Sequence, residues 1–113
     1  MLGRHGDVAQ VLTSRGHALK TCGRADEAVD SYQRAYAAQA DYGDAYWSLA
    51  NLKTYRFSDA EMASMASQEA SSDTSPENRY HLCFALGKAF EDQGDFRSSF
   101  DYYDKGNRLK RQQ

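Results

Sequence analysis

The chain has 113 residues, a formal net charge of −2 at pH 7 and a hydrophobic content of 41%. This length allows one domain, and a charge so near balance offers nucleic acid no electrostatic attraction. No apolar run approaches the roughly 20 residues that a membrane-spanning helix needs, so neither nucleic acid nor a membrane is an expected partner.

The first third of the chain predicts two helices joined by a tight turn. Residues 1–7 lack the apolar stretch of a signal peptide and are interpreted as a lead-in, so that the helix pair covers residues 8–42. The first helix ends with the string GHALKTCG, whose last residue, Gly23, supplies the left-handed backbone that ends a helix at low steric cost. In the second helix, Tyr32 follows the small residue Ala28 by four positions, so both are expected on one face.

Residues 43–75 predict a second pair with a degenerate sequence. Met62 and Glu69 stand where the repeat pattern calls for small residues, and Phe57 stands in place of the turn glycine. The second helix of this pair is therefore expected to be shifted or tilted. Its start is marked by the run Ser58-Asp59-Ala60-Glu61, a capping box in which serine and glutamate each satisfy an unpaired backbone amide.

Residues 76–113 repeat the first pair. The string GKAFEDQG again ends a helix in glycine, and the following residues align with the first pair without a gap, so that Tyr103 corresponds to Tyr32. Pro76 suits the first position of a helix, and Ser75 before it is the expected cap. Four cations lie near the chain end, where a helix C-terminus favours positive charge: Lys105, Arg108, Lys110 and Arg111.

Small residues recur at one place in the three pairs. Gly16, Ala50 and Gly87 are spaced by 34 and 37 residues, and a small side chain there lets the helices of a pair cross closely, opposite Ala28 and Ser99. This pattern resembles the tetratricopeptide repeat, a helix-turn-helix unit. The resemblance implies an all-α solenoid of three such pairs in a right-handed superhelix. It also implies a scaffold or adaptor for protein–protein interaction.

Residues that would perform catalysis or bind a metal are not grouped in the sequence. The three histidines are scattered, and Cys22 and Cys83 have neither the spacing of a metal site nor the number for a disulfide framework. No glycine-rich loop follows a strand, as phosphate binding in nucleotide-binding folds requires. We therefore expect no enzyme activity, metal or cofactor in this chain, and a reducing, cytoplasmic location.

The resemblance also implies a binding stripe, because in this family the first helices of successive pairs line a concave groove. Its mixture of aromatic, amide and charged groups suits an extended peptide or a neighbouring domain. Trp47 and Phe84 are equally well explained by contacts between repeats, and that alternative stays open. Carried over position by position, the stripe consists of Gln10, Thr13, His17, Lys20, Asp44, Trp47, Asn51, Thr54, His81, Phe84, Lys88 and Glu91.

Two longer strings carry a closer resemblance. GDAYWSLANLKTYRFSDAE, starting at Gly43, and FALGKAFED, starting at Phe84, are similar to the segment that precedes the catalytic domain in bacterial proteins that fuse tetratricopeptide repeats to a sulfotransferase. The resemblance implies a downstream domain that transfers sulfate from an adenylyl-sulfate donor. This chain would then be the accessory repeat region, which positions the substrate or the catalytic domain.

The last helix is expected to leave an apolar edge. Phe100, Tyr103 and Leu109 are expected to face outward at the end of the solenoid, where a following domain or a second copy would cover them. A homodimer through the C-terminal helix, and hence a role as an oligomerisation unit, is therefore a further alternative.

Overall fold

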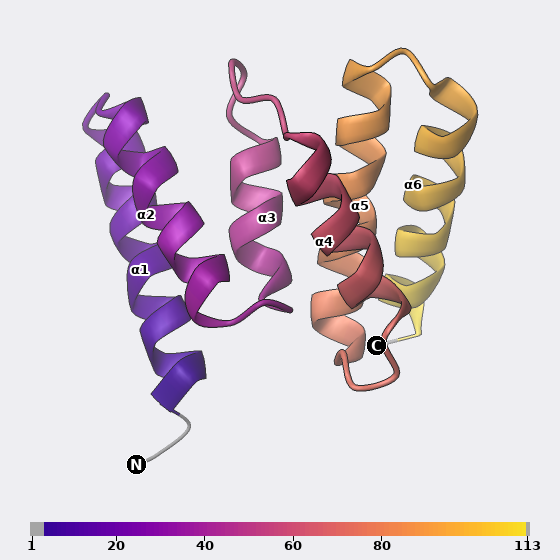
Figure 1. Cartoon of the computed structure of the whole chain (residues 1–113), viewed down its shortest axis with the longest axis horizontal. Helices are drawn as coiled ribbons and strands as arrows, with labels where there is room; N and C mark the ends of the chain where they lie inside the picture. The colour runs from indigo at the N-terminus through magenta and orange to yellow at the C-terminus, as the bar shows by residue number, and fades with distance from the viewer. Residues whose placement is uncertain (1–3, 113) are drawn as a thin grey trace.

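The structure, a computed structural model, describes residues 4–112 and consists of six helices in three antiparallel pairs (Figure 1). In Figure 1, α2 and α4 lie in front of α1, α3 and α5, and α6 forms one end. The all-α solenoid is confirmed, although the first helix begins inside the predicted lead-in. The helices are α1 (Arg4–Thr21), α2 (Ala25–Ala38), α3 (Gly43–Ala50), α4 (Asp59–Ala70), α5 (Pro76–Asp92) and α6 (Phe96–Arg111).

Glycine ends both α1 and α5, as the sequence predicts. Gly23 and Gly94 have φ angles of +79° and +82°, in the left-handed region that residues with a side chain rarely adopt. In α5 the amide of Asp95 then donates to the carbonyl of Phe90 at 2.9 Å, and the equivalent bond in α1 has the same length. These bonds satisfy carbonyls that would otherwise be unpaired at the helix ends.

The two predicted helix caps are also confirmed. At α4, the Glu61 amide donates to Ser58 Oγ at 3.1 Å, and the Ser58 amide donates to Glu61 Oε1 at 2.9 Å. At α5, the Asn78 amide donates to Ser75 Oγ at 3.2 Å, and Pro76 occupies the first helical position, where its missing N–H costs nothing. The degenerate middle pair therefore keeps a sharp start to its second helix.

The two outer pairs cross closely at a glycine. A methyl group at Gly16 would lie less than 3.0 Å from three ring atoms of Tyr32. At Gly87 it would lie 2.9–3.0 Å from the ring of Tyr103. The close crossing is confirmed, and the atoms nearest to each glycine belong to a tyrosine ring rather than to Ala28 or Ser99.

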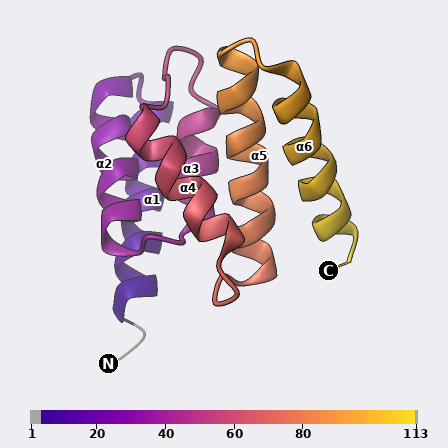
Figure 2. The ribbon, with the colours of Figure 1, turned by 45° about the vertical axis from the view of Figure 1, so that its right-hand side comes forward.

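The middle pair is irregular in both of its helices. Helix α3 has only eight residues and ends at Ala50, after which residues 51–58 form a turn segment anchored by the buried Leu52. Helix α4 packs more closely on α5 than on α3, and Figure 2 shows it inclined across the neighbouring helices. Met62, at the position of a small residue, packs in the core cluster that joins α3, α4 and α5.

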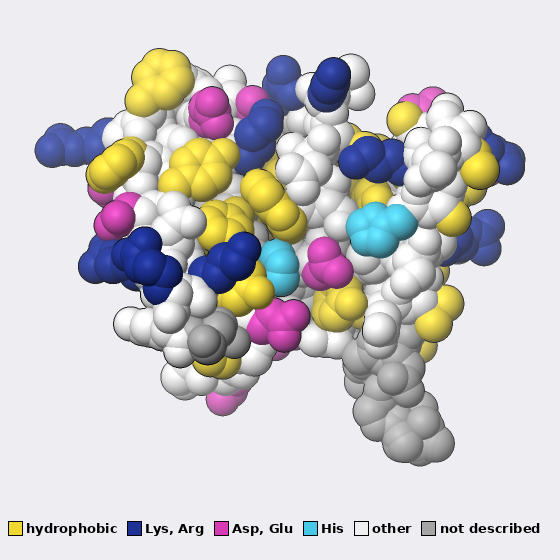
Figure 3. Space-filling view, turned by 180° about the vertical axis from the view of Figure 1, so that it is seen from behind, with side chains coloured by type: hydrophobic (Ala, Val, Ile, Leu, Met, Phe, Trp, Pro, Cys, Tyr) yellow, Lys and Arg dark blue, Asp and Glu magenta, His cyan; other side chains and the backbone are white. Residues whose placement is uncertain are grey.

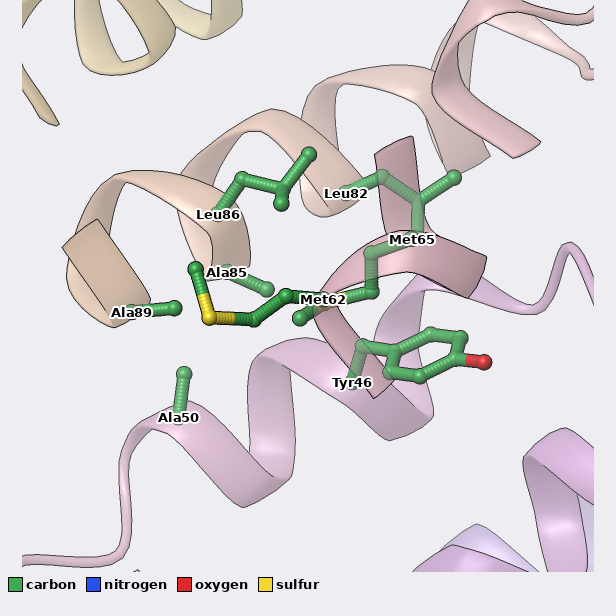
Figure 4. Packing of buried hydrophobic residues seen from close by; sticks show 8 residues of the cluster. All are labelled: Tyr46, Ala50, Met62, Met65, Leu82, Ala85, Leu86 and Ala89. Atoms are coloured by element: carbon green, nitrogen blue, oxygen red, sulfur yellow. The ribbon is translucent and has the colours of Figure 1, made fainter. Parts of the chain in front are cut away.

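The space between α3 and α4 is filled by the ring of Tyr46 (Figure 4). The ring is 1% exposed, stacks on Tyr36 of α2 with centroids 4.5 Å apart, and packs with Met62 and Met65. Its hydroxyl lies 3.4 Å from Ser64 Oγ. Tyr46 therefore joins α3 to α2 and α4. Its cluster also contains Ala50, Leu82, Ala85, Leu86 and Ala89.

A carboxylate on the outer side ties α2 to α4. Glu61 Oε2 accepts hydrogen bonds from the hydroxyls of Tyr36, at 2.7 Å, and Tyr55, at 2.5 Å. Tyr55 also accepts from Gln33 Nε2 at 3.0 Å. Burial, reinforced by the nearby carboxylate, raises the pKa of both tyrosines.

These raised pKa values predict loss of stability in alkali. Burial also raises the pKa of Tyr103 and of the buried Cys83 thiol to about 12. A group that holds its proton more tightly when folded stabilises the fold below its ordinary pKa, near 10 for tyrosine and 9 for cysteine. We therefore expect the free energy of unfolding to be steady up to about pH 9 and to fall steadily above it. Urea titrations between pH 8 and 12 measure this, and a rise in stability over that range would contradict it.

Glu69, predicted as an irregular residue of the middle pair, links α4 to α6. Its side chain is 6% exposed, and its carboxylate forms an ion pair with Lys105 Nζ at 2.5 Å. A buried carboxylate is stable only when its charge is compensated. The ion pair therefore explains how a glutamate occupies a position that suits a small residue.

Removal of one partner of this ion pair is expected to be costly. Lys105→Met should lower the free energy of unfolding by about 1–3 kcal/mol, below the usual range for buried pairs because Lys105 is itself half-exposed. The double variant Glu69→Leu/Lys105→Met should recover most of that loss, because no uncompensated charge remains. Equal stability of the Lys105→Met variant and the original chain in urea would show that the pair is unimportant.

The predicted apolar edge of α6 is present only in part. Phe100 is exposed as predicted, and Phe96 joins it. The prediction for Tyr103 is wrong, because its ring is packed against Gly87, and Leu109 is half-buried. The apolar edge of the last helix therefore consists of two phenylalanines one turn apart.

Candidate functional site

The first helices of the three pairs, α1, α3 and α5, form the surface opposite to α2 and α4, which we call the inner face. Figure 3 shows the molecule from that side. Hydrophobic side chains gather near its centre, and histidine, acidic and basic side chains lie around them. The inner face is therefore chemically mixed, as the sequence predicts for the binding stripe.

The centre of the inner face is an aromatic contact between α3 and α5. The rings of Trp47 and Phe84 are half-buried, and their centroids are 5.5 Å apart. Phe84 also faces Tyr80 at 5.9 Å and packs against Gly106, where an added methyl would lie 2.7 Å from the ring. Of the two explanations for this pair, contact between repeats is thus observed directly, while part of each ring stays accessible.

Both histidines of the stripe are held through Nδ1. His17 Nδ1 is hydrogen-bonded to the hydroxyl of the buried Tyr32 at 2.8 Å, and the rings meet edge to face. His81 Nδ1 is bonded to the carbonyl of Glu77 at 2.9 Å, with the ring against Tyr80. Within the described residues neither Nε2 has a hydrogen-bond partner, so each ring presents this nitrogen for contact.

Acidic groups lie at one end of the inner face. A hollow of about 350 Å³ opens between the start of α5 and the turn before α3, beside the half-buried Asp44. Asp44 adds to the effect of burial in raising the pKa of Tyr32 and of Tyr42. The hollow is lined by Gln10, Gln39, Tyr42, Asp44, Ser75, Glu77, Asn78 and His81.

Near the other end of α5, two stripe residues already have partners, one on α5 itself and one on α6. Lys88 Nζ lies 2.7 Å from Asp92 Oδ1, one turn along α5. The hydroxyl of Tyr103 donates to Glu91 Oε1 at 3.2 Å. Lys20, at the end of α1, is exposed. This end therefore combines an exposed lysine with a neutralised one.

Three stripe positions differ from their predicted placement. Thr13 is 2% exposed, so the prediction that it lines the groove is wrong: α1 turns this residue toward the core. Asn51 and Thr54 are exposed but do not lie on a helix, because α3 ends at Ala50. The remaining nine positions lie on helices with accessible or half-buried side chains: Gln10, His17, Lys20, Asp44, Trp47, His81, Phe84, Lys88 and Glu91.

Sequence reasoning missed the join between the turn before α3 and α5. Asn78 Oδ1 accepts a hydrogen bond from the Gly43 amide at 3.1 Å. A methyl at Gly43 would come within 3.0 Å of the His81 side chain, so glycine is required there by close contact. The only signal in the sequence was the unexplained glycine at the start of a helix.

Stacked antiparallel helix pairs with an open, mixed inner face define a helical-repeat protein. The sequence profile of the tetratricopeptide repeat matches residues 9–42 and 80–113, more than half of the chain. The chain belongs to the tetratricopeptide-repeat family, whose repeats generally mediate protein–protein interaction. No curated protein and no solved structure is significantly similar to it.

The middle of the chain, residues 43–79, lies outside both profile matches. This is the part in which Phe57, Met62 and Glu69 depart from the repeat pattern and α4 stands away from α3. In the described part of the chain no three histidine, cysteine or acidic side chains are grouped to hold a metal ion. The surface chemistry of the inner face is therefore the best-defined candidate for function.

Proposed function

We propose that the inner face binds an extended segment of a partner protein, so that the chain acts as a scaffold or adaptor. The observation that carries the proposal is the accessible Trp47–Phe84 pair at the centre of this face. Large rings give contact area at a small cost in conformational entropy, and they dominate the energetics of many interfaces. Packing between α3 and α5 fixes the rings before a ligand arrives.

Polar groups around this pair would orient the bound segment. His17 and His81 offer Nε2 on either side of α3, and the exposed Asn51 amide can pair with a peptide backbone. Lys20 would attract a carboxylate, whereas Asp44 in the hollow would attract a basic side chain. The proposed contacts are His17, Lys20, Asp44, Trp47, Asn51, Thr54, His81, Phe84, Lys88 and Glu91.

The test is selection of peptides from a random displayed library followed by titration. Trp47 is the only tryptophan in the chain, so its fluorescence reports directly on the inner face. A selected peptide should change that emission, and His81→Ala should weaken its binding by about tenfold, as loss of an interface anchor does. The matched control is Arg34→Ala on the outer side of α2, which should bind as the original chain does.

Two outcomes would contradict the proposal. One is selected peptides that bind without any change in tryptophan emission. The other is equal affinity for the original chain and the His81→Ala variant while Arg34→Ala is impaired. Both variants alter accessible side chains, so unfolding in urea should stay within about 0.5 kcal/mol of the original and rule out misfolding as the cause.

A second candidate function rests on the strings that begin at Gly43 and Phe84. They favour a role as the accessory repeat region of a sulfotransferase, in which the inner face would hold the catalytic domain or its substrate. The sequence of the native gene downstream of this region tests the sulfotransferase role. A downstream sequence of alternating strands and helices, with a phosphate-binding loop after its first strand, would support it, and an immediate stop codon would contradict it.

A further inference from the structure

Exposed large hydrophobic side chains in the described residues are confined to the two end helices. Val8 and Val11 of α1 are 46% and 66% exposed, and Phe96 and Phe100 of α6 are 70% and 69% exposed. The helices between them bury their large apolar groups or half-bury them. The solenoid therefore has an apolar patch at each end.

The patch on α6 corresponds to a surface that is covered inside the molecule. In the alignment of the first and third pairs, Phe100 takes the place of Val29. Val29 packs in the cluster that contains Leu49 and Leu52, which belong to the following pair. Phe100 thus occupies a position that a following helix pair would cover.

The patch on α1 corresponds to the complementary surface. Val11 takes the place of Ala45 in the second pair and of Leu82 in the third, and both of those are fully buried. Ala45 packs on Ala9 and Ala35 of the preceding pair. Val11 thus occupies a position that a preceding helix pair would cover.

Charge favours a contact between α6 and α1 over a contact between two α6 helices. Helix α6 carries five cationic side chains against two carboxylates, and an excess of cations remains after Lys105 pairs with Glu69. Two α6 helices in contact would therefore oppose like charges. The α1 end is close to charge balance, because in its hollow Glu27 pairs with Arg24 and Asp30 pairs with Arg34, so it does not repel α6. The hollow is lined by Leu12, Arg15, Leu19, Asp26, Glu27, Asp30, Ser31 and Arg34.

We infer that the chain associates with a second copy of itself head to tail, with the Phe100 surface of one copy against the Val11 surface of the next. The contact would repeat the internal junction between the first and second pairs, placing Phe100 near Arg15 of the neighbour. Because the two surfaces are different, the contact is heterologous, and an assembly of any length keeps one free α1 surface at one end and one free α6 surface at the other. This inference is independent of ligand binding on the inner face.

Two exposed positions allow a decisive test by sedimentation velocity over a range of concentrations. Val11→Lys disrupts only the α1 surface, by facing the cationic α6 of the neighbour, and Phe100→Lys disrupts only the α6 surface, by facing Arg15 of the neighbour. Each variant alone should be a monomer, with association weakened at least about tenfold, since a charge replaces an apolar contact. An equimolar mixture should form a dimer, because each variant still supplies the surface that the other lacks. Ala63→Lys, on the exposed side of α4, is the matched control and should associate as the original chain does.

Each remaining outcome would overturn the inference. A chain that stays monomeric at the highest concentration has no such contact. Association that survives Val11→Lys but not Phe100→Lys indicates a symmetrical α6 dimer, and association that survives both variants lies elsewhere. Circular dichroism of each variant establishes that the helices persist, so loss of folding is distinguished from loss of contact.

Discussion

Replacement of Tyr46 by alanine is expected to lower the free energy of unfolding by about 3–5 kcal/mol, the range for removing a buried aromatic ring. The ring is 1% exposed and fills the space left by the displaced α4. Its loss opens a cavity against Met62, Met65 and the stacked ring of Tyr36. Urea unfolding followed by circular dichroism measures the effect.

The matched variant is Tyr46→Phe, which keeps the ring and removes only the hydroxyl. The lost contact with Ser64 is long, at 3.4 Å, so the expected cost is no more than about 0.5–1.5 kcal/mol. If Tyr46→Ala loses several times more stability than Tyr46→Phe, the loss is due to the packing of the ring. Similar losses for the two variants would contradict the role assigned to the ring.

Replacement of Gly16 by leucine is expected to lower the free energy of unfolding by about 1–3 kcal/mol or more, through overpacking. The new side chain would enter the ring of Tyr32, which is fully buried and bonded to His17. Gly87→Leu should also lower the free energy of unfolding, because Tyr103 occupies the same place in the last pair. The loss should be smaller than at Gly16, since the ring of Tyr103 is only half-buried and can move aside more easily.

A double-mutant cycle tests this mechanism directly. Glycine inside a helix is less favourable than alanine by about 1 kcal/mol, so alanine at Gly16 would stabilise the chain if there were room. In the Tyr32→Ala background there is room, and Gly16→Ala is expected to be neutral or stabilising. In the original background it is expected to destabilise. The same sign in both backgrounds would refute steric conflict with Tyr32.

Local features of the fold could be predicted from the sequence because they depend on neighbouring residues. Gly23 and Gly94 end helices through their own backbone conformation, and the Ser58–Glu61 capping box closes within four residues. The recurrence of Gly16, Ala50 and Gly87 was enough to define stacked helix pairs. These features together predicted the architecture, and the resemblance to the tetratricopeptide repeat implied the stripe, nine of whose twelve positions lie on helices of the inner face.

Features that depend on distant residues could not be predicted in the same way. The early end of α3 follows from burial of Leu52 against the first pair, and it moves Asn51 and Thr54 off the helix. The partner of Glu69 lies on α6, far along the chain. Each depends on how the pairs pack, which spacing alone does not specify.

The most direct test of the inner face as the binding surface is a map of amide chemical-shift changes on addition of a selected peptide. We predict that the largest changes fall on α1, α3 and α5, with the indole N–H of Trp47 among them. Helices α2 and α4 should change little on their outer sides. Changes confined to α2 and α4, or to the ends near Val11 and Phe100, would contradict the assignment of function to the inner face.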